Sequence, residues 1–483
     1  MEEPTIKQKT ISGLFWRYAE RCGAQGIQFV VSIVLARLLS PGDYGIIGLI
    51  TVFIALANVF ISCGFGQALV QKKDADDIDY SSVFYFNIAA AIVLYFVMFF
   101  CAPSIARFYD NMLLVPVIRV LSVTLIIGGI NGVQQAYVQK TMQFKRFFWA
   151  TLGGTIVSAF VGIAVAYSGL GVWALVAQQL TNQVIDTIIL WITVRWRPVL
   201  RFSVNRMKRL FSYGWKLLAS NLLDTAYNNM YSLIIGKVYT KADLGYYNRG
   251  KQFPMLIIEN INSSINSVIF PVLASVQDEK QRLKEMMRRS MTISTFIIFP
   301  AMAGLAAVAK PLTLLLLTEK WLPAVPFIQF CCFTYAFWPV ATANLQAIKA
   351  IGRSDVFLKL EIIKKIIGIT ALCLTVRHGL MVMMWAKCVN AILSSVINAY
   401  PNKKLLNYSY FEQMRDMLPS MALSLAMCVV VLCFNFLSLS PVITMILQIL
   451  SGACIYVLAA WLLKIETLEY FLSTVRKTRK NKD

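Results

Sequence analysis

The chain has 483 residues, of which 58% are hydrophobic and only 14% are charged, and its mean hydropathy is +0.63. About a quarter of the residues of a soluble domain are charged, so this composition indicates an integral membrane protein instead. The net charge of +22 would also fit a nucleic-acid-binding protein. The basic residues, however, gather in short loops between apolar runs, as the positive-inside rule describes. We therefore expect membrane lipids as partners, and no nucleic acid.

Apolar runs of roughly 20 residues recur along the chain, and each predicts a membrane-spanning helix. The richest basic segments follow even-numbered helices, so both termini are predicted to be cytoplasmic (N-in, C-in). The first span has no small-residue cleavage pattern, so no cleavable signal peptide is expected. About 14 transmembrane helices are predicted, over residues 11–38, 44–70, 80–106, 113–139, 147–168, 171–194, 209–237, 244–275, 288–309, 322–350, 355–376, 380–400, 417–437 and 440–463.

Short motifs recur weakly in the two halves of the chain. "LSPGDYGIIG" (39–48) returns as "YTKADLGYYN" (239–248), which matches Asp43 with Asp243 and Gly45 with Gly245. Six helices per repeat is an even number, so both halves insert in the same direction, as a parallel repeat. The predicted all-α fold therefore has two six-helix lobes related by a pseudo-two-fold axis, residues 1–200 and 201–405. A helix pair with a basic cytoplasmic tail follows, residues 406–483.

The first predicted helix carries ionisable groups where an apolar face is expected. Arg17, Arg21, Gln25 and Gln28 are spaced 4, 4 and 3 residues apart and so share one face, with Glu20 beside the arginines. The two arginines fit snorkelling to the cytoplasmic interface. The two glutamines continue the stripe toward the middle of the membrane, which favours a water-filled cavity.

Other predicted helices show similar polar stripes, which by default face a bundle interior or a cavity. For any single amide, an interhelical hydrogen bond is the alternative interpretation. The intramembrane cations exceed the nearby carboxylates, so the predicted cavity suits an anionic cargo such as a diphosphate. The further candidate cations for such a cargo are Arg119, Arg249, Lys251 and Lys387. The candidate polar lining residues are Gln135, Gln179, Gln183, Asn221, Asn228, Gln252 and Asn266. The candidate carboxylates for coupling to protons or cations are Glu20, Asp186, Asp224 and Glu259.

The motifs of enzymes and ATP-driven pumps are missing from the sequence. No Walker A motif is present, and a single histidine, His378, makes a Ser-His-Asp set impractical. The ten cysteines lie in apolar spans without metal-ligand spacing, so no metal site is predicted. The "DADD" run at 74–77 resembles a metal-binding Asp-x-Asp motif only by chance. We expect no catalytic residue and no cofactor, apart from a coupling proton or cation gradient.

Two segments carry a resemblance to a known family. "LARLLSPGDYG" (35–45) and "ADLGYYNRGKQF" (242–253) resemble the polysaccharide transporter family, the Wzx/WzxC-type branch of the multidrug/oligosaccharidyl-lipid/polysaccharide (MOP) flippase superfamily. The resemblance implies a flippase of the bacterial inner membrane that moves undecaprenyl-diphosphate-linked oligosaccharides for O-antigen, capsule or exopolysaccharide synthesis by alternating access. The sequence leaves open whether such a flippase works alone or docked to a polysaccharide polymerase complex. A lipid II flippase, a small-molecule (multidrug) exporter and a membrane enzyme that acts on the same lipid-linked sugars remain the alternatives.

Overall fold

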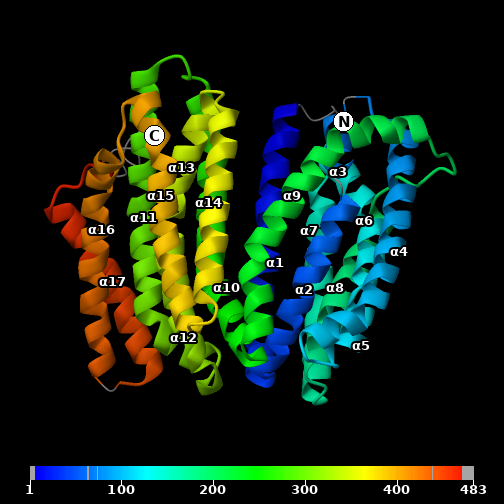
Figure 1. Ribbon diagram of the computed structural model, residues 1–483, viewed down its shortest axis with the longest axis horizontal. Helices are drawn as coiled ribbons and strands as arrows, with labels where there is room; N and C mark the ends of the chain where they lie inside the picture. Colours follow the sequence, from blue (N-terminus) through cyan, green and yellow to red (C-terminus); the bar gives the residue numbers. More distant parts are fainter. Residues whose placement is uncertain (1–5, 63–64, 73, 438, 470–483) are drawn as a thin grey trace. The chain divides into compact units, whose positions relative to one another are not determined.

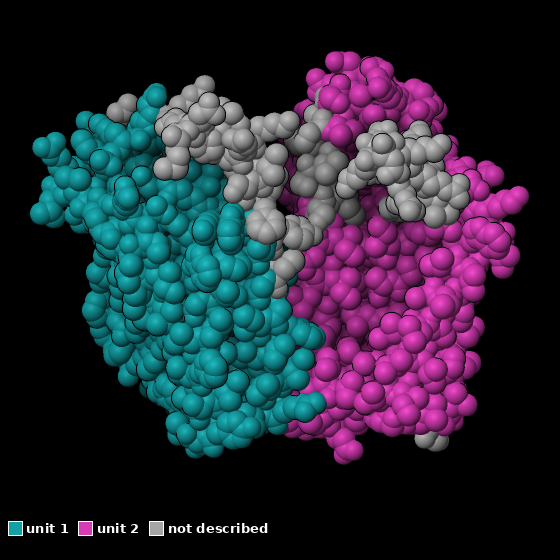
Figure 2. Space-filling model, turned by 180° about the vertical axis from the view of Figure 1, so that it is seen from behind, with its two compact units in different colours: residues 1–245 teal, residues 246–483 magenta. Residues whose placement is uncertain are grey.

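The computed structural model describes residues 6–62, 65–72, 74–437 and 439–469, and in these residues it contains helices and no strands (Figure 1). The chain divides into two compact units, which Figure 2 distinguishes by colour: unit 1 is residues 1–245 and unit 2 is residues 246–483. Each unit is described by itself below.

Unit 1 contains nine complete helices and the start of a tenth among the described residues. They are α1 (Ile6–Leu38), α2 (Pro41–Ser62), α3 (Phe65–Gln71), α4 (Asp77–Phe108), α5 (Leu114–Leu121), α6 (Val123–Lys140), α7 (Phe144–Tyr167), α8 (Val172–Thr193), α9 (Val204–Val238) and the first turn of α10 (Lys241–Ala274).

Unit 2 contains the rest of α10 and the helices that follow it. They are α11 (Lys280–Leu316), the short 3-10 helix η1 (Glu319–Ala324), α12 (Val325–Ala336), α13 (Trp338–Ala350), α14 (Ser354–Thr375), α15 (Leu380–Leu406), α16 (Tyr410–Cys433), the 3-10 turn η2 (Phe434–Phe436) and α17 (Pro441–Leu462).

The all-α membrane fold is confirmed. Within the described residues, nine helical stretches are long and apolar enough to cross a bilayer. Five further helices of 22 to 35 residues, α1, α8, α9, α10 and α14, are outside this set. The described part of α1 includes a shorter apolar stretch, Gly23–Leu38.

Several predicted helices are divided in the structure. The stretch predicted at 322–350 is interrupted at Phe337, two residues before Pro339 in the first turn of α13. Proline has no backbone N–H to donate to the preceding turn, so a new helix begins there. The stretch predicted at 113–139 is divided at Ser122 into α5 and α6.

The centre of unit 1 depends on close packing of α7 against α8 and of α1 against α7. A Cβ at Gly154 would lie 2.9 Å from the Asn182 carbonyl oxygen, and a Cβ at Gly162 would lie 2.9 Å from the Gln178 Cβ. Ser158, between these glycines, accepts a hydrogen bond from Asn182 Nδ2 at 3.3 Å. The small residues of α7 therefore bring its backbone close to the polar face of α8.

The two copies of the repeated motif adopt the same local structure at the starts of α2 and α10. The Asp43 carboxylate accepts from the Ser40 hydroxyl at 2.6 Å, and the Asp243 carboxylate accepts from the Thr240 hydroxyl at 2.7 Å. In return, each hydroxyl accepts from the backbone N–H of the aspartate, at 3.3 and 3.1 Å. Each motif therefore forms a reciprocal cap on the first turn of its helix.

In unit 2, α11 packs against α12, α13, α16 and α17. A buried amide network joins α13 to two other helices. Asn344 Nδ2 of α13 donates to Gln413 Oε1 of α16 at 2.8 Å, and Asn402 Nδ2 of α15 donates to Asn344 Oδ1 at 2.7 Å. Figure 1 shows α16 and α17 side by side. The Tyr456 hydroxyl of α17 donates to the Phe296 carbonyl of α11 at 2.9 Å. The C-terminal helix pair, α16 and α17, therefore packs against α11 within unit 2.

Candidate functional site

Unit 1 contains a polar pocket with a volume of about 780 Å³. Its walls come from α1, α2, α3, α4, α6, α7, α8 and α9. It extends from the middle of α8 to Gln139, one residue before the end of α6 at Lys140. The pocket therefore runs toward the end of unit 1 where the chain carries its basic loops.

Amide side chains dominate the lining of this pocket. Among the described lining residues there is one carboxylate, Asp186, and no lysine or arginine. The amides are Gln28, Asn58, Asn87, Asn131, Gln135, Gln139, Gln178, Gln179, Asn182, Gln183 and Asn221.

Some of these amides hold the helices together. Asn131 Nδ2 of α6 donates to the Asp186 carboxylate of α8 at 2.8 Å. Gln183 Nε2 of α8 donates to the Thr124 carbonyl of α6 at 2.9 Å. Together with the bond from Asn182 to Ser158, these contacts position α8 between α6 and α7, and so support the interpretation of single amides as interhelical bonds.

A second group of amides makes no side-chain hydrogen bond within the described part of the chain. Each amide group offers two donors and an acceptor oxygen, so a row of them matches hydroxyl groups, which also both donate and accept. This group consists of Gln28, Gln135, Gln139, Gln178, Gln179 and Asn221.

The sequence-predicted residues that the structure brings into this pocket come from four helices. Two other described candidates of unit 1 are not among the lining residues. Glu20 accepts from the Thr151 hydroxyl at 3.3 Å, and Arg119 packs over the Phe99 ring at 4.1 Å. The predicted residues that line the pocket are Gln28, Gln135, Gln179, Gln183, Asp186 and Asn221.

Other candidates lie on α9 or outside the described residues. Asp224 and Asn228 are exposed on α9. The side chains of Arg17, Arg21 and Asn266 are not among those that the structure describes. Gln25 is described, but it is not among the lining residues of the pocket.

Two candidate cations of unit 2, Lys387 and Arg249, lie beside aromatic rings. Lys387 Nζ of α15 donates to the Tyr247 hydroxyl of α10 at 3.1 Å and lies 5.9 Å from the centre of the Tyr335 ring. Arg249 is buried, donates to Gln252 Oε1 at 2.6 Å, and lies 6.0 Å from the centre of the Trp321 ring.

Two further candidates share α10 with Arg249. Lys251 is half-buried and Glu259 is exposed. Unit 2 therefore holds candidate cations on α10 and α15, whereas the described lining of the unit 1 pocket has amides and one carboxylate.

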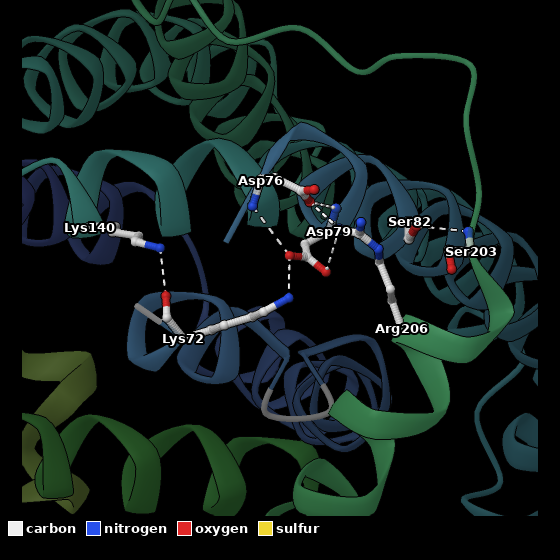
Figure 3. Close-up of polar contacts among 7 residues, drawn as sticks. All are labelled: Lys72, Asp76, Asp79, Ser82, Lys140, Ser203 and Arg206. Atoms are coloured by element: carbon white, nitrogen blue, oxygen red, sulfur yellow. Dashed lines mark hydrogen bonds and ion pairs between the residues drawn. The ribbon is translucent and has the colours of Figure 1, made fainter. Parts of the chain in front are cut away.

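An ion-pair cluster lies near the starts of α4 and α9 in unit 1 and is shown in Figure 3. The fully buried carboxylate of Asp79 pairs with Lys72 and lies 3.3 Å from Arg206 Nη1, and Arg206 also pairs with Asp76. The Ser203 N–H donates to Ser82 Oγ at 3.0 Å. These contacts attach the start of α9 to the start of α4.

The pocket also contains residues that the stripe pattern missed. Asn58 of α2 and Asn87 of α4 are isolated amides in apolar helices, so periodicity offered no signal for them. Gln139, Gln178 and Asn182 lie one to four residues from predicted lining residues on their own helices, and a wider helical face would have included them.

The family described as "Polysaccharide biosynthesis protein" matches residues 34–326. The chain belongs to this family. The matched segment contains both repeated motifs and every described lining residue of the unit 1 pocket except Gln28.

Two bacterial proteins are similar to this chain over most of its length. The teichuronic acid biosynthesis protein TuaB of Bacillus subtilis is 24% identical over 461 residues, which cover 94% of this chain and 95% of TuaB. The lipopolysaccharide biosynthesis protein WzxC of Escherichia coli is 24% identical over 425 residues, which cover 86% of this chain and 83% of WzxC. The Wzx/WzxC-type resemblance is therefore confirmed.

The fold of this family member is also that of a solved flippase. The inward closed conformation of the lipid II flippase MurJ matches with a TM-score of 0.74 and 13% sequence identity, over 94% of this chain and 100% of that chain. At this identity the likeness is one of fold. The chain is thus a multi-pass membrane protein of polysaccharide biosynthesis with a flippase fold.

Proposed function

We propose that this protein moves undecaprenyl-diphosphate-linked oligosaccharides from the cytoplasmic to the periplasmic leaflet of the bacterial inner membrane. The observation that carries this proposal is the amide-lined pocket inside the helical bundle of unit 1. A volume of about 780 Å³ lies within the range of about 300–1,000 Å³ that is usual for ligand sites. Its uncommitted amides suit a cargo rich in hydroxyl groups.

The charge of this pocket argues against a cationic drug as cargo. A cation would have only Asp186 as a counter-charge among the described lining residues, and Asn131 already donates to that carboxylate. Sugar hydroxyls need no counter-charge. They gain instead from paired donors and acceptors, which six uncommitted amides supply.

In this proposal the diphosphate is bound by cations separate from the sugar-binding amides. Arginine and lysine are the usual partners of phosphate oxygens. The proposed cations are Arg17, Arg21, Arg119, Arg249, Lys251 and Lys387. Gln25, Asn228, Gln252 and Asn266 extend the polar path, and Glu20, Asp186, Asp224 and Glu259 couple transport to a proton or cation gradient.

The proposed architecture has fourteen membrane-spanning helices, and both termini lie in the cytoplasm. This proposal is supported by nine candidate spans among the described residues and by five further helices of 22 to 35 residues. The two six-helix lobes, residues 1–200 and 201–405, alternate access to the two sides of the membrane, and residues 406–483 form the additional helix pair and tail. A polysaccharide polymerase complex receives the cargo.

The decisive experiment is mass spectrometry of polyprenyl-diphosphate saccharides in a deletion strain that is complemented by variants. The strain is expected to accumulate one lipid-linked oligosaccharide, which the wild-type chain removes. Gln135→Leu/Gln179→Leu is expected to slow its export at least about tenfold, because two hydrogen bonds of about 1 kcal/mol each are lost. Gln329→Leu, an exposed amide outside the pocket, is the control and is expected to export normally.

Three outcomes would contradict this proposal. If nothing accumulates and the deletion strain becomes drug-sensitive, the protein is a small-molecule exporter. If deletion is lethal and lipid II accumulates, the cargo is lipid II. If the double variant exports as well as the Gln329→Leu control, while both are present in equal amounts in the membrane, the unit 1 pocket does not bind the sugars.

A further inference from the structure

Unit 2 contains a second pocket, with a volume of about 720 Å³, which the proposed transport path does not use. It lies where α11 begins, where α16 begins and where the chain continues beyond α17. In Figure 1 the helices α11, α16 and α17 lie near one another in unit 2. Its lining residues lie within three segments, 282–293 of α11, 415–420 of α16 and 463–467 after α17. Not every residue of these segments lines the pocket.

The polar side of this pocket has an excess of positive charge. Its described lining includes three carboxylates, Glu285, Asp416 and Glu466, and five cations. The cations are Arg282, Arg288, Arg289, Arg415 and Lys464.

Among the described residues, only some of these cations form ion pairs. Arg288 pairs with Asp416 at 2.8 Å, and Arg282 pairs with Glu279 at 3.4 Å. Within the described part of the chain, Arg415 and Lys464 form no ion pair. They approach the pocket from α16 and from the segment after α17, so an anion between them would join two elements that are far apart in the sequence.

The other side of the pocket is apolar and continues onto an apolar surface. Met286, Ile293, Pro419, Leu463 and Ile465 line it. At the adjoining end of α17, the exposed fractions of Trp461, Leu462 and Leu463 are 60%, 70% and 66%. Such exposure of large apolar groups in a membrane helix is a surface for acyl chains.

We propose that this pocket binds one anionic glycerophospholipid, with the phosphate held by Arg415 and Lys464 and the acyl chains along α17. Basic pockets between helices at the cytoplasmic side of a membrane protein are suited to anionic headgroups. A guanidinium and an ammonium both donate to phosphate oxygens. The apolar wall distinguishes this ligand from a soluble phosphate, and the recess distinguishes it from a diffuse layer of lipid on a flat basic surface.

The test is native mass spectrometry of the full-length protein with added phosphatidylglycerol or phosphatidylcholine. The wild-type chain is expected to retain one phosphatidylglycerol in preference to phosphatidylcholine. Arg415→Gln/Lys464→Gln is expected to lower that preference at least about tenfold, because two basic contacts with an anionic headgroup are removed. Arg415→Lys keeps the positive charge and is expected to retain most of the preference for phosphatidylglycerol. That result would show that the loss in the double variant comes from the lost charge and not from misfolding.

The matched control is Lys403→Gln/Lys404→Gln. These exposed lysines end α15 in the same unit and are not in the pocket, and the change in net charge is identical. An equal loss in both double variants would show non-specific attraction and overturn the proposal.

Two competitors complete the test. Displacement of the lipid by millimolar inorganic phosphate would show that the apolar wall contributes nothing. Stronger retention of undecaprenyl phosphate than of phosphatidylglycerol would assign the pocket to the cargo. Either result would also overturn the proposal, whereas resistance to both competitors would support it.

Discussion

At the scale of single residues, Asp79 occupies an unusual position. Its carboxylate is fully buried in the first turn of α4 and faces both Lys72 and Arg206. It also accepts from the Asp76 N–H at 3.2 Å, while the Asp79 N–H donates to Asp76 Oδ1 at 3.0 Å. One side chain thus completes a helix cap and contacts two cations.

Asp79→Ala is expected to lower the free energy of unfolding by about 1–3 kcal/mol, because it removes a buried partner from two cations that are themselves partly exposed. Asp77→Ala is the control. Asp77 is exposed in the same turn and forms no ion pair in the described part of the chain, so its removal is expected to change the free energy by less than about 0.5 kcal/mol. Thermal unfolding in detergent measures both, and equal effects would contradict the role of the ion pairs.

The pH dependence of this cluster follows from Asp76. A hydrogen bond from Arg206 lowers the pKa of the Asp76 carboxyl group from its ordinary value of 3.8 to about 2. As the pH falls, the unfolded chain takes up this proton first. The stabilisation is therefore complete above about pH 4 and is lost as the pH falls toward 2.

The difference in unfolding temperature between the wild type and Asp76→Asn measures this effect, because asparagine keeps the capping acceptor and removes the charge. The difference is expected to be constant above pH 4 and to shrink below it. A difference that is unchanged down to pH 2.5 would show that the charge of Asp76 does not contribute.

At the scale of helices, the starts of α2 and α10 approach each other through two glycines. A Cβ at Gly45 would lie 1.9 Å from the Lys241 carbonyl oxygen, and a Cβ at Gly245 would lie 1.9 Å from the Pro41 carbonyl oxygen. Both partners are backbone atoms, which have no alternative rotamer. The reciprocity explains why the repeated motif keeps a glycine at the same position in both copies.

Gly45→Ala and Gly245→Ala are each expected to destabilise the protein by at least about 3 kcal/mol, the upper end of overpacking costs, because backbone must move. Gly42→Ala is the control, since its Cβ would lie 3.7 Å from Ser40 Oγ. In that open space alanine is expected to be neutral or slightly stabilising in the helix. The yield of monodisperse protein after heating compares the three variants, and identical yields would contradict the close approach.

At this scale, prediction from the sequence depends on a periodic pattern along one helix. The polar stripe of α8 was recognised from Gln179, Gln183 and Asp186, because their spacing places them on one face. The buried network of Asn344, Asn402 and Gln413 was missed. Each of these residues is a single amide on its own helix, and only the packing of α13, α15 and α16 brings them within hydrogen-bonding distance.

At the scale of the whole molecule, the distribution of basic residues predicts an orientation that can be measured. Alkaline phosphatase is expected to be active when it is fused after Asn111 or Gly169, in the loops before α5 and α8. It is expected to be inactive when it is fused after Met142 or Leu200, in the loops before α7 and α9. The reason is that the second pair of loops adjoins the basic segments. The reverse pattern would place both termini outside the cytoplasm.

The sequence by itself determined that this chain is a helical membrane protein with a repeated motif and several polar helix faces. Those properties depend on local composition and periodicity, which are readable along one helix at a time. Only the tertiary structure decided which amides share the unit 1 pocket and which are used in bonds between helices. It also revealed that Asp76, within an apparently accidental acidic run, pairs with Arg206. Hydrogen bonds and ion pairs between residues more than a hundred positions apart depend on packing, for which one helix carries no periodic signal.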